Sequence, residues 1–395
     1  MTSIGDAAAH TCTGCGACKA ICPADAISYE INRDGFFEAQ VDSNKCVRCG
    51  KCTTVCLRFG VKEPAEKLLN AKMCAAQSTT ASTVYECTSG GIAHEIAQWG
   101  IRQGFYVLGT VYNHATSRAE MRLVATMEEI EAFKGSKYIQ SDAAGVPEKF
   151  VSMAKDDPKQ GFVIFGTPCQ IYGLRQLAVQ AKLSNPIYYI DLFCHGVPSY
   201  LVWDAFRKEQ GFAKTTQVEF RDHRAPWHFF HLKLANKEKY KVLDKEKATF
   251  YQLFFDNQSL NYSCSDCPVR KETSAADIRL GDFWGKRYAK RLDGVSLCAV
   301  MTENGSELMR QLQKENCLSV LQDVPAEEGL MAQSTHAYKT QQSAAFEQIQ
   351  GGKTLEQIIR DYRKHAGAKS KLKWTAKSMI ASLPMACQKL LRKIM

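Results

Sequence analysis

Twelve of the seventeen cysteines in this 395-residue chain stand in patterns that can hold a metal. Eight of them form two runs, CTGCGACKAIC and CVRCGKCTTVC, and both runs read C-x2-C-x2-C-x3-C. Cysteines with two residues between them let the thiolates of one tight loop reach different irons of a single cubane. Each run therefore predicts three ligands of a [4Fe-4S] cluster. Its fourth cysteine has already turned away into the next element.

That fourth cysteine ligates the other cluster in bacterial two-cluster ferredoxins, which these runs resemble. The predicted ligands of one cluster are Cys12, Cys15, Cys18 and Cys56. The predicted ligands of the second cluster are Cys46, Cys49, Cys52 and Cys22. Between the runs, residues 26–42 alternate in polarity and contain an Asp-Gly pair, which predicts a β-hairpin. Two zinc sites are the alternative, although zinc needs only four ligands per site in looser spacing.

The rest of the composition is that of an ordinary globular chain, with 45% hydrophobic residues. No apolar run approaches the roughly 18 residues that span a bilayer. The opening residues, MTSIGDAAAH, lack the basic start and the apolar stretch of a signal peptide. Because the cysteines stand at ligand spacing and no export signal is visible, we expect a reducing cytoplasm and not a disulfide framework.

The formal net charge of +10 is concentrated at the end of the chain. Nine lysines and arginines and no acidic residues follow Asp361, so residues 1–361 carry only +1. A nearly neutral body gives no reason to expect a nucleic-acid partner. The basic tail either contacts an acidic surface, on an anionic membrane or on a partner protein, or remains solvated.

Helices and strands are expected to alternate in the body of the chain. Helices are predicted over 90–104, 170–182 and 199–211, and strands over 105–112, 162–169 and 187–194, the second of which runs into a turn. This alternation predicts a mixed or parallel sheet that binds its ligands at the carboxyl ends of its strands.

Two loops of the body carry side chains suited to a cofactor. Ser89, Gly90 and Gly91 open a helix whose free amides suit a phosphate or pyrophosphate, although Thr-Ser-Gly-Gly is also an ordinary N-cap. Lys137 beside Tyr138 suits the anionic edge of a flavin ring, and a solvated loop is the alternative.

Two further loops follow buried strands, where turns line a site. Gly166 and Thr167 belong to GTPCQ, and His195 belongs to DLFCHGVPS. Each of these loops also carries a cysteine. The alternative for the second loop is that Cys194 is a buried thiol and His195 a hydrogen-bonded imidazole, without a functional role.

Four cysteines from three segments of the body could form one further site. They are Cys169, Cys194, Cys264 and Cys267. Four thiolates are what one [4Fe-4S] cluster needs, so we predict a third cluster here. Zinc could use the same sulfurs, His195 could replace one of them, and Cys169 could act alone as a redox thiol. The remaining five cysteines are expected to be structural thiols: Cys74, Cys87, Cys298, Cys317 and Cys387.

As a set, the body motifs resemble those of one known family. SGG, GSKYIQS, GTPCQ, FCHGVPS, FRD, the C-x2-C pair and DIRLGDFWG occur in this order in the beta-subunit family of coenzyme F420 hydrogenases and dehydrogenases. The resemblance covers roughly residues 10–340. It implies a flavin enzyme in which iron–sulfur clusters feed FAD in an α/β body. Cys87 departs from the family pattern, which often has Ser there.

On this resemblance, the expected FAD-binding residues are Ser89, Gly90, Gly91, Lys137, Gly166, Thr167 and His195. The expected fold is α+β: a two-[4Fe-4S] ferredoxin domain over residues 1–60, a linker over 61–80, an α/β domain for FAD and substrate over 81–345, and a helical basic tail over 346–395.

The expected function is that of a flavin-dependent iron–sulfur oxidoreductase. Its clusters would exchange electrons with a carrier protein such as ferredoxin. Its flavin would exchange them with a two-electron partner, either coenzyme F420 or another small-molecule substrate. The alternatives are a non-catalytic electron-transfer subunit that docks a separate enzyme, and a protein with structural clusters whose body binds another ligand.

Overall fold

The structure is a computed structural model and describes residues 3–6, 11–143, 145–331, 333, 342–365, 367–384, 387 and 390. Its N-terminal domain holds the two cysteine runs around short helices α1 (Ala17–Ala20) and α2 (Lys51–Thr54). The hairpin of β1 (Ile27–Ile31) and β2 (Phe37–Val41) lies between them in antiparallel register. The hairpin predicted over residues 26–42 is therefore confirmed.

The body is built on a nine-stranded mixed sheet with the order β16-β4-β15-β14-β9-β8-β5-β6-β7. Four neighbouring strands at its centre, β14, β9, β8 and β5, run parallel. Parallel strands are buried on both faces, which matches the continuous apolar stretch in β8. The strands are β4 (Lys72–Ser78), β5 (Tyr106–Asn113), β6 (Arg118–Val124), β7 (Ser141–Asp142), β8 (Phe162–Phe165), β9 (Ile187–Leu192), β14 (Ile278–Asp282), β15 (Ser296–Val300) and β16 (Leu318–Val324).

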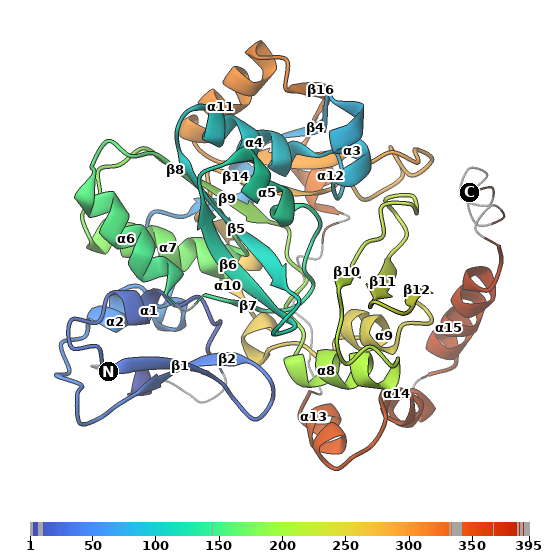
Figure 1. The fold of residues 1–395 in the computed structure, drawn as a ribbon. Helices are drawn as coiled ribbons and strands as arrows, with labels where there is room; N and C mark the ends of the chain where they lie inside the picture. Colours follow the sequence, from blue (N-terminus) through green and yellow to red (C-terminus); the bar gives the residue numbers. More distant parts are fainter. Residues whose placement is uncertain are drawn as a thin grey trace.

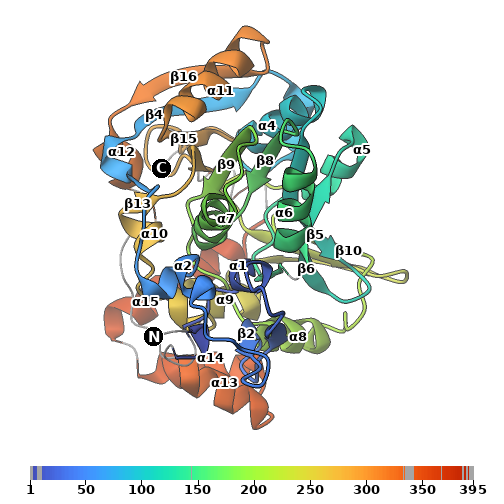
Figure 2. The same ribbon diagram turned by 90° about the vertical axis from the view of Figure 1, so that its left-hand side faces the viewer.

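Helices cover both faces of this sheet. One face packs against α4 (Ile92–Arg102) and α11 (Glu303–Lys314), with α5 (Met127–Ile130) beside them. The other face packs against α6 (Val146–Asp156) and α7 (Pro168–Gln180). The N-terminal domain shares this second core through Ala17, Cys52 and Val55, and it lies beneath α7 in both views (Figures 1 and 2).

A second lobe is built around an aromatic core. Its three-stranded sheet consists of β10 (Gln217–Glu219), β11 (His231–Ala235) and β12 (Tyr240–Asp244). The helices around it are α8 (Tyr200–Glu209), α9 (Thr249–Phe255), α13 (Gln342–Gln350) and α14 (Leu355–Lys364). The last helix, α15 (Ala368–Ala381), lies at the outer edge of this lobe (Figure 1).

Short elements complete the chain. They are β3 (Glu66–Lys67), β13 (Thr273–Ser274), α3 (Ala81–Glu86), α10 (Pro268–Lys271), α12 (Ala326–Met331) and five single turns of 3-10 helix at Ile4–Asp6, Leu57–Phe59, Leu68–Asn70, Glu131–Phe133 and Tyr262–Cys264. Among the described residues, no helix is both long and apolar enough to cross a bilayer.

The body strands and helices expected from the sequence are confirmed as β5, β8, β9, α4, α7 and α8. Two domain boundaries need correction. The linker expected over 61–80 is wrong from Lys72 onward, because β4 lies between β15 and β16 inside the main sheet. Residues 346–364 are helical but are not a separate tail, because Phe346, Leu355 and Ile358 pack into the aromatic core. Most of residues 385–395 lie outside the described part.

Candidate functional site

The structure groups the eight N-terminal cysteines into two sets of four. Cys22, Cys46, Cys49 and Cys52 line one small hollow together with Pro23 and Gly50. This set combines three cysteines of the second run with the last one of the first run. We call it the outer group, because Cys49 is exposed to solvent.

The inner group consists of Cys12, Cys15, Cys18 and Cys56. Burial raises the pKa of the Cys18 thiol well above its usual value, and the nearby charges of Cys15, Cys12 and Cys56 raise it further. Burial likewise raises the pKa of Cys56 to about 12. Four thiols in a dry site are protonated without a metal, and a cluster that binds them as thiolates displaces these protons.

The inner group contacts the body through α7. A Cβ atom added to Gly173 would stand 2.8 Å from the Sγ of Cys15, so only glycine permits this approach. Tyr172, beside it, accepts a hydrogen bond from the backbone of Lys62 at 3.1 Å and donates one to the carbonyl of Gly60 at 3.1 Å. The N-terminal domain is therefore fixed to α7 at the inner group.

The four body cysteines form a third group at the start of α7. Burial raises the pKa of Cys169 well above its usual value, and the charges of Cys267, Cys194 and Cys264 raise it further. Burial, with Cys267 beside it, raises the pKa of Cys194 to about 11. The four thiols that the sequence assigned to one site therefore do lie together. We call them the body group.

Sulfur spacing bears on which metal suits these groups. Tetrahedral zinc, with bonds near 2.3 Å, sets its sulfurs about 3.8 Å apart. Within the described chain, the only three potential ligands closer than 4.8 Å to one another belong to Glu219, Asp222 and His223. A cubane carries each thiolate on a different iron and so keeps the sulfurs further apart. Whether the body group holds a cubane or zinc stays a prediction.

The Glu219, Asp222 and His223 cluster does not suit a cation. Arg224 bonds both oxygens of Asp222, with Nε at 2.9 Å from one and 3.1 Å from the other. Lys233 donates to Glu219 at 3.0 Å. These carboxylates already have cationic partners.

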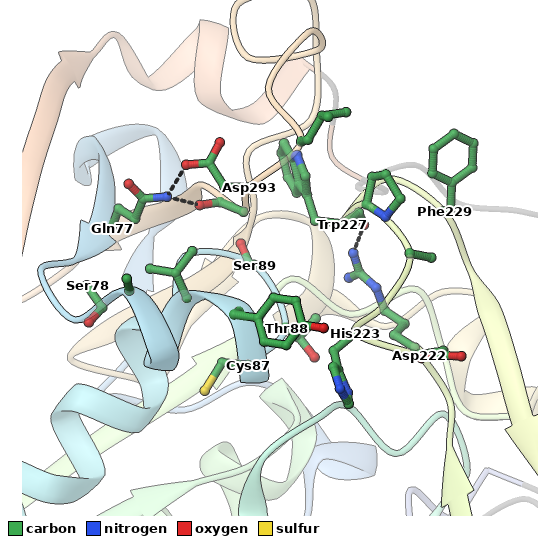
Figure 3. A pocket seen from close by; sticks show the side chains of 18 of the residues that line it. Gln77, Ser78, Cys87, Thr88, Ser89, Asp222, His223, Trp227, Phe229 and Asp293 are labelled. Carbon is green, nitrogen blue, oxygen red and sulfur yellow. Dashed lines mark hydrogen bonds between the residues drawn. The ribbon is translucent and has the colours of Figure 1, made fainter. Parts of the chain in front are cut away.

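A cavity of about 480 Å³ lies where the carboxyl end of β4 meets the loop that follows β10. Gln77 and Ser78 lie on one side of it and Asp222, His223 and Phe229 on the other, as Figure 3 shows. Tyr85 and Trp227 add aromatic rings to the lining. The volume is in the range of small-molecule sites, about 300–1,000 Å³. Aromatic side chains beside a few polar groups are typical of such sites.

Ser89 is the one predicted FAD residue that lines the cavity. Its hydroxyl donates to the carbonyl of Val295 at 2.8 Å. Gly90 and Gly91 have packing roles: a Cβ on Gly90 would lie 2.6 Å from the carbonyl of Ala76, and Gly91 has a φ of +81°. Their contact with a phosphate stays a prediction.

Lys137 has its own partners away from the cavity. Its ammonium donates to the carbonyls of Ala132, Phe133 and Lys134 at 2.9 to 3.0 Å, which uses all three of its protons. Burial lowers the pKa of Lys137 to about 7. Tyr138 packs among the rings of the aromatic core, including Phe254. The expected flavin contact of Lys137 stays a prediction.

The other three predicted FAD residues lie at the body group. Thr167 caps α7, and its Oγ1 stands 3.2 Å from the Sγ of Cys169. Gly166 precedes it and donates to the carbonyl of Ile190. His195 follows Cys194 and packs edge-on against Phe254, with ring centroids 5.0 Å apart. Their neighbours are the body thiols, and none of the three lines the cavity.

The cavity and the body group are close neighbours in the fold. Phe193, next to Cys194, fills the space that a Cβ on Gly281 would need, at 2.7 Å. The carbonyl of Gly281 is in turn 3.5 Å from the hydroxyl of Ser89 in the cavity wall. Phe193 and Gly281 of β14 therefore form one path of contacts between the loop of Cys194 and the cavity wall.

Sequence reasoning missed several residues of the cavity. Arg221 lines it and donates to Asp282 at 2.6 Å, and Trp227 stacks on Trp284 with centroids 5.6 Å apart. Arg221 belongs to the FRD motif, which was noted only as part of a pattern. The position of Arg221 between Phe220 and Trp227 in the sequence was the signal that could have predicted this part of the cavity lining.

Two family models match the chain. Residues 11–58 match the 4Fe-4S dicluster domain. Residues 160–325 match the C-terminal part of the coenzyme F420 hydrogenase/dehydrogenase beta subunit. The second match covers α7, β9 and β14, and with them the entire body group.

Individual relatives are more distant. A stretch of 47 residues is 51% identical to one component of the Na(+)-translocating ferredoxin:NAD(+) oxidoreductase complex of Acetobacterium woodii, covering 12% of this chain and only 13% of that component. The uncharacterized protein MJ1349 of Methanocaldococcus jannaschii is 23% identical over 314 residues, which cover 71% of this chain and 86% of that protein.

Among solved structures, the F420-reducing [NiFe] hydrogenase complex of Methanosarcina barkeri contains a similar chain. The TM-score is 0.47 at 15% identity, over 69% of this chain and 92% of that one. The family matches, with the grouped cysteines, give the assignment. The chain carries a 4Fe-4S dicluster domain followed by a domain of the coenzyme F420 hydrogenase/dehydrogenase beta-subunit family.

Proposed function

We propose that the protein is a flavin-dependent iron–sulfur oxidoreductase. Electrons would pass between a carrier protein, the outer and inner [4Fe-4S] clusters, a third cluster in the body group, and FAD in the cavity. The two-electron partner at the flavin would be coenzyme F420 or another organic substrate.

One observation carries this proposal: α7 joins the inner group to the body group. Cys169 and Gly173 lie four residues apart on this helix, a rise of about 6 Å, and Gly173 is the residue that contacts Cys15. Electron relays need such short steps between centres. A purely structural pair of clusters has no need of a third thiol group directly beside them.

The residues of the chain have distinct tasks in this scheme. Cys169, Cys194, Cys264 and Cys267 would hold the third cluster. Trp227, Tyr85 and Ser89 would border the FAD, which supplies the exchange between one-electron and two-electron chemistry. Phe193, which packs on Gly281, would lie between the third cluster and the flavin.

The test of the flavin is mass spectrometry of the molecules released when anaerobically purified protein is denatured. We expect FAD at about one per chain, and a visible band near 450 nm that reductant bleaches. A preparation with full iron and no flavin would contradict the proposal.

A matched pair of variants tests where the flavin binds. Tyr85 lines the cavity and is 57% exposed, so Tyr85→Ala removes an aromatic wall at little cost to folding. We expect FAD affinity to fall about five- to tenfold, as for the loss of one aromatic contact. Tyr240→Ala, at a 69% exposed ring outside the cavity lining, is the control and should retain FAD. Equal retention by both variants would place the flavin elsewhere.

A non-catalytic electron-transfer subunit is the second candidate. The exposed Cys49 of the outer group and the similarity to a component of a ferredoxin-linked complex favour it. Turnover of a reduced deazaflavin or ferredoxin by the isolated chain decides between the two. In either case we place the protein in a reducing cytoplasm, which suits its seventeen free cysteines.

A further inference from the structure

The last helix, α15, is attached to the protein by one of its faces. The ring of Trp374 packs edge-on against Tyr362, with centroids 6.3 Å apart, and the guanidinium of Arg363 lies 4.5 Å above it. Two turns further on, Ala381 is buried. Trp374 and Ala381 therefore mark the inner face of α15.

The opposite face of α15 presents apolar side chains to solvent. Leu372 is 73% exposed and Met379 is 68% exposed. At about 100° per residue, these two side chains lie within about 20° of one another and nearly opposite Trp374 and Ala381. Ile380 extends the exposed apolar surface. We call Leu372, Met379 and Ile380 the apolar stripe.

This arrangement reverses the usual order of a surface helix. An amphipathic helix normally turns its apolar side chains to the core and its polar ones to water. Here Trp374 makes the contact of the inner face with the rest of the protein. The apolar stripe is exposed to solvent within the described chain. A row of exposed aliphatic residues of this kind marks an interaction surface.

The charge around the stripe points to an anionic partner. Lys371 and Lys377 are exposed on the same helix, where Lys371 donates to the carbonyl of Lys364 at 2.9 Å and Lys377 lies 3.9 Å from a carboxylate oxygen of Glu246. After Asp361 the sequence contains seven lysines, two arginines and no acidic residue. Lysines beside an apolar stripe can extend their ammonium groups to phosphates while their stems cover apolar surface.

A lipid surface fits this composition better than a protein does. The cores of protein interfaces are depleted of lysine and enriched in aromatic residues, whereas this stripe is aliphatic and its surroundings are rich in lysine. Helices that lie on anionic membranes combine an apolar face with lysines in this way. We propose that α15 binds the surface of an anionic membrane, with the apolar stripe at the acyl boundary and the helix in the plane of the interface.

The test is flotation of the full-length protein with extruded vesicles. Vesicles of phosphatidylcholine with about one-third phosphatidylglycerol should bind at least tenfold more protein than pure phosphatidylcholine, and salt should weaken the binding. The triple variant Leu372→Ser, Met379→Ser, Ile380→Ser should lose at least tenfold in binding.

A control triple variant changes exposed apolar residues elsewhere: Leu69→Ser, Val179→Ser and Met331→Ser, which are 64%, 49% and 79% exposed. It should bind vesicles like the unchanged protein. Iron and flavin content should be the same in all three proteins, which separates this test from that of the proposed function.

Three outcomes would overturn the proposal. The unchanged protein could fail to float with anionic vesicles, or the stripe variant could float as well as the control. The protein could also bind immobilised polyglutamate without floating, which would assign the stripe to an acidic protein surface.

Discussion

Solvent exposure differs among the thiols of the three groups. Cys49 of the outer group is exposed, whereas Cys18 of the inner group is buried and the four body thiols are partly buried. Burial and nearby charge are among the levers that set the potential of an iron–sulfur centre. The exposed Cys49 would suit the outer group to exchange electrons with a partner, and the inner and body groups, which have no exposed thiol, would suit an internal relay.

The iron count tests the body group directly. Three cubanes carry about 12 irons and two carry about 8. We expect about 12 in protein purified without oxygen, and Cys267→Ala should lose about 4 of them. Both ferredoxin-type EPR signals should survive in this variant, because Cys267 belongs to neither N-terminal group.

Cys317→Ala is the matched control, since Cys317 lies outside the three groups and contacts Arg102. It should keep all its iron. A count near 8 with one zinc in the unchanged protein would favour zinc in the body group. A count near 8 without zinc would leave these thiols without a metal.

Site residues could be predicted from the sequence where residues close together in the chain form the site. Ligand spacing within a run identified the eight N-terminal cysteines, because one loop holds most of each set. The facing pair Cys74 and Cys298 was not predicted, since strand register brings them together across β4 and β15. Lys137 was given a flavin contact, yet it bonds the carbonyls of its own loop. Such choices depend on tertiary packing.

At the scale of elements, α7 organises the molecule. Thr167 and Gln170 form a capping box at its N-terminus, which fixes the turn that carries Cys169. One turn later Gly173 receives Cys15, and the same helix packs on β9. The sequence predicted this helix and the strands around it from their apolar periodicity. It did not predict β4, whose charged flanking residues suggested a linker although the strand lies inside the sheet.

Gly173, where α7 contacts Cys15, gives a prediction for this helix. Alanine is favoured over glycine inside a helix by about 0.8–1.0 kcal/mol. Gly173→Ala is nevertheless expected to lower the thermal unfolding temperature and to change the EPR signal of the inner cluster, because the new methyl would stand 2.8 Å from Cys15. Gly367→Ala, with nothing within 4 Å of its added carbon, should leave both unchanged. A stabilised Gly173→Ala protein with an unaltered signal would show that the two domains do not meet at this point.

At the scale of the whole molecule, the three groups and the cavity follow one order. The outer group includes the exposed Cys49, the inner group contacts α7, the body group includes Cys169 in the first turn of α7, and Phe193 and Gly281 connect the loop of Cys194 to the cavity wall. The fold places the N-terminal domain on the α7 face of the sheet, and the cavity lies where the sheet meets the second lobe. In the proposed scheme, electrons that enter at the outer group would pass through the inner group before they reach the body group.

Removal of the inner cluster tests this order. Cys15→Ala should abolish one ferredoxin-type EPR signal and slow the reduction of bound flavin by reduced ferredoxin at least tenfold, because the route loses its middle step. Reduction of the flavin by dithionite should survive, since a small reductant reaches the cavity directly. Stopped-flow measurement at the flavin band, with Cys317→Ala as the control, distinguishes the two routes. An unchanged EPR spectrum would sink the ligand assignment. A lost signal with an unchanged rate from ferredoxin would mean that electrons enter the body by another surface.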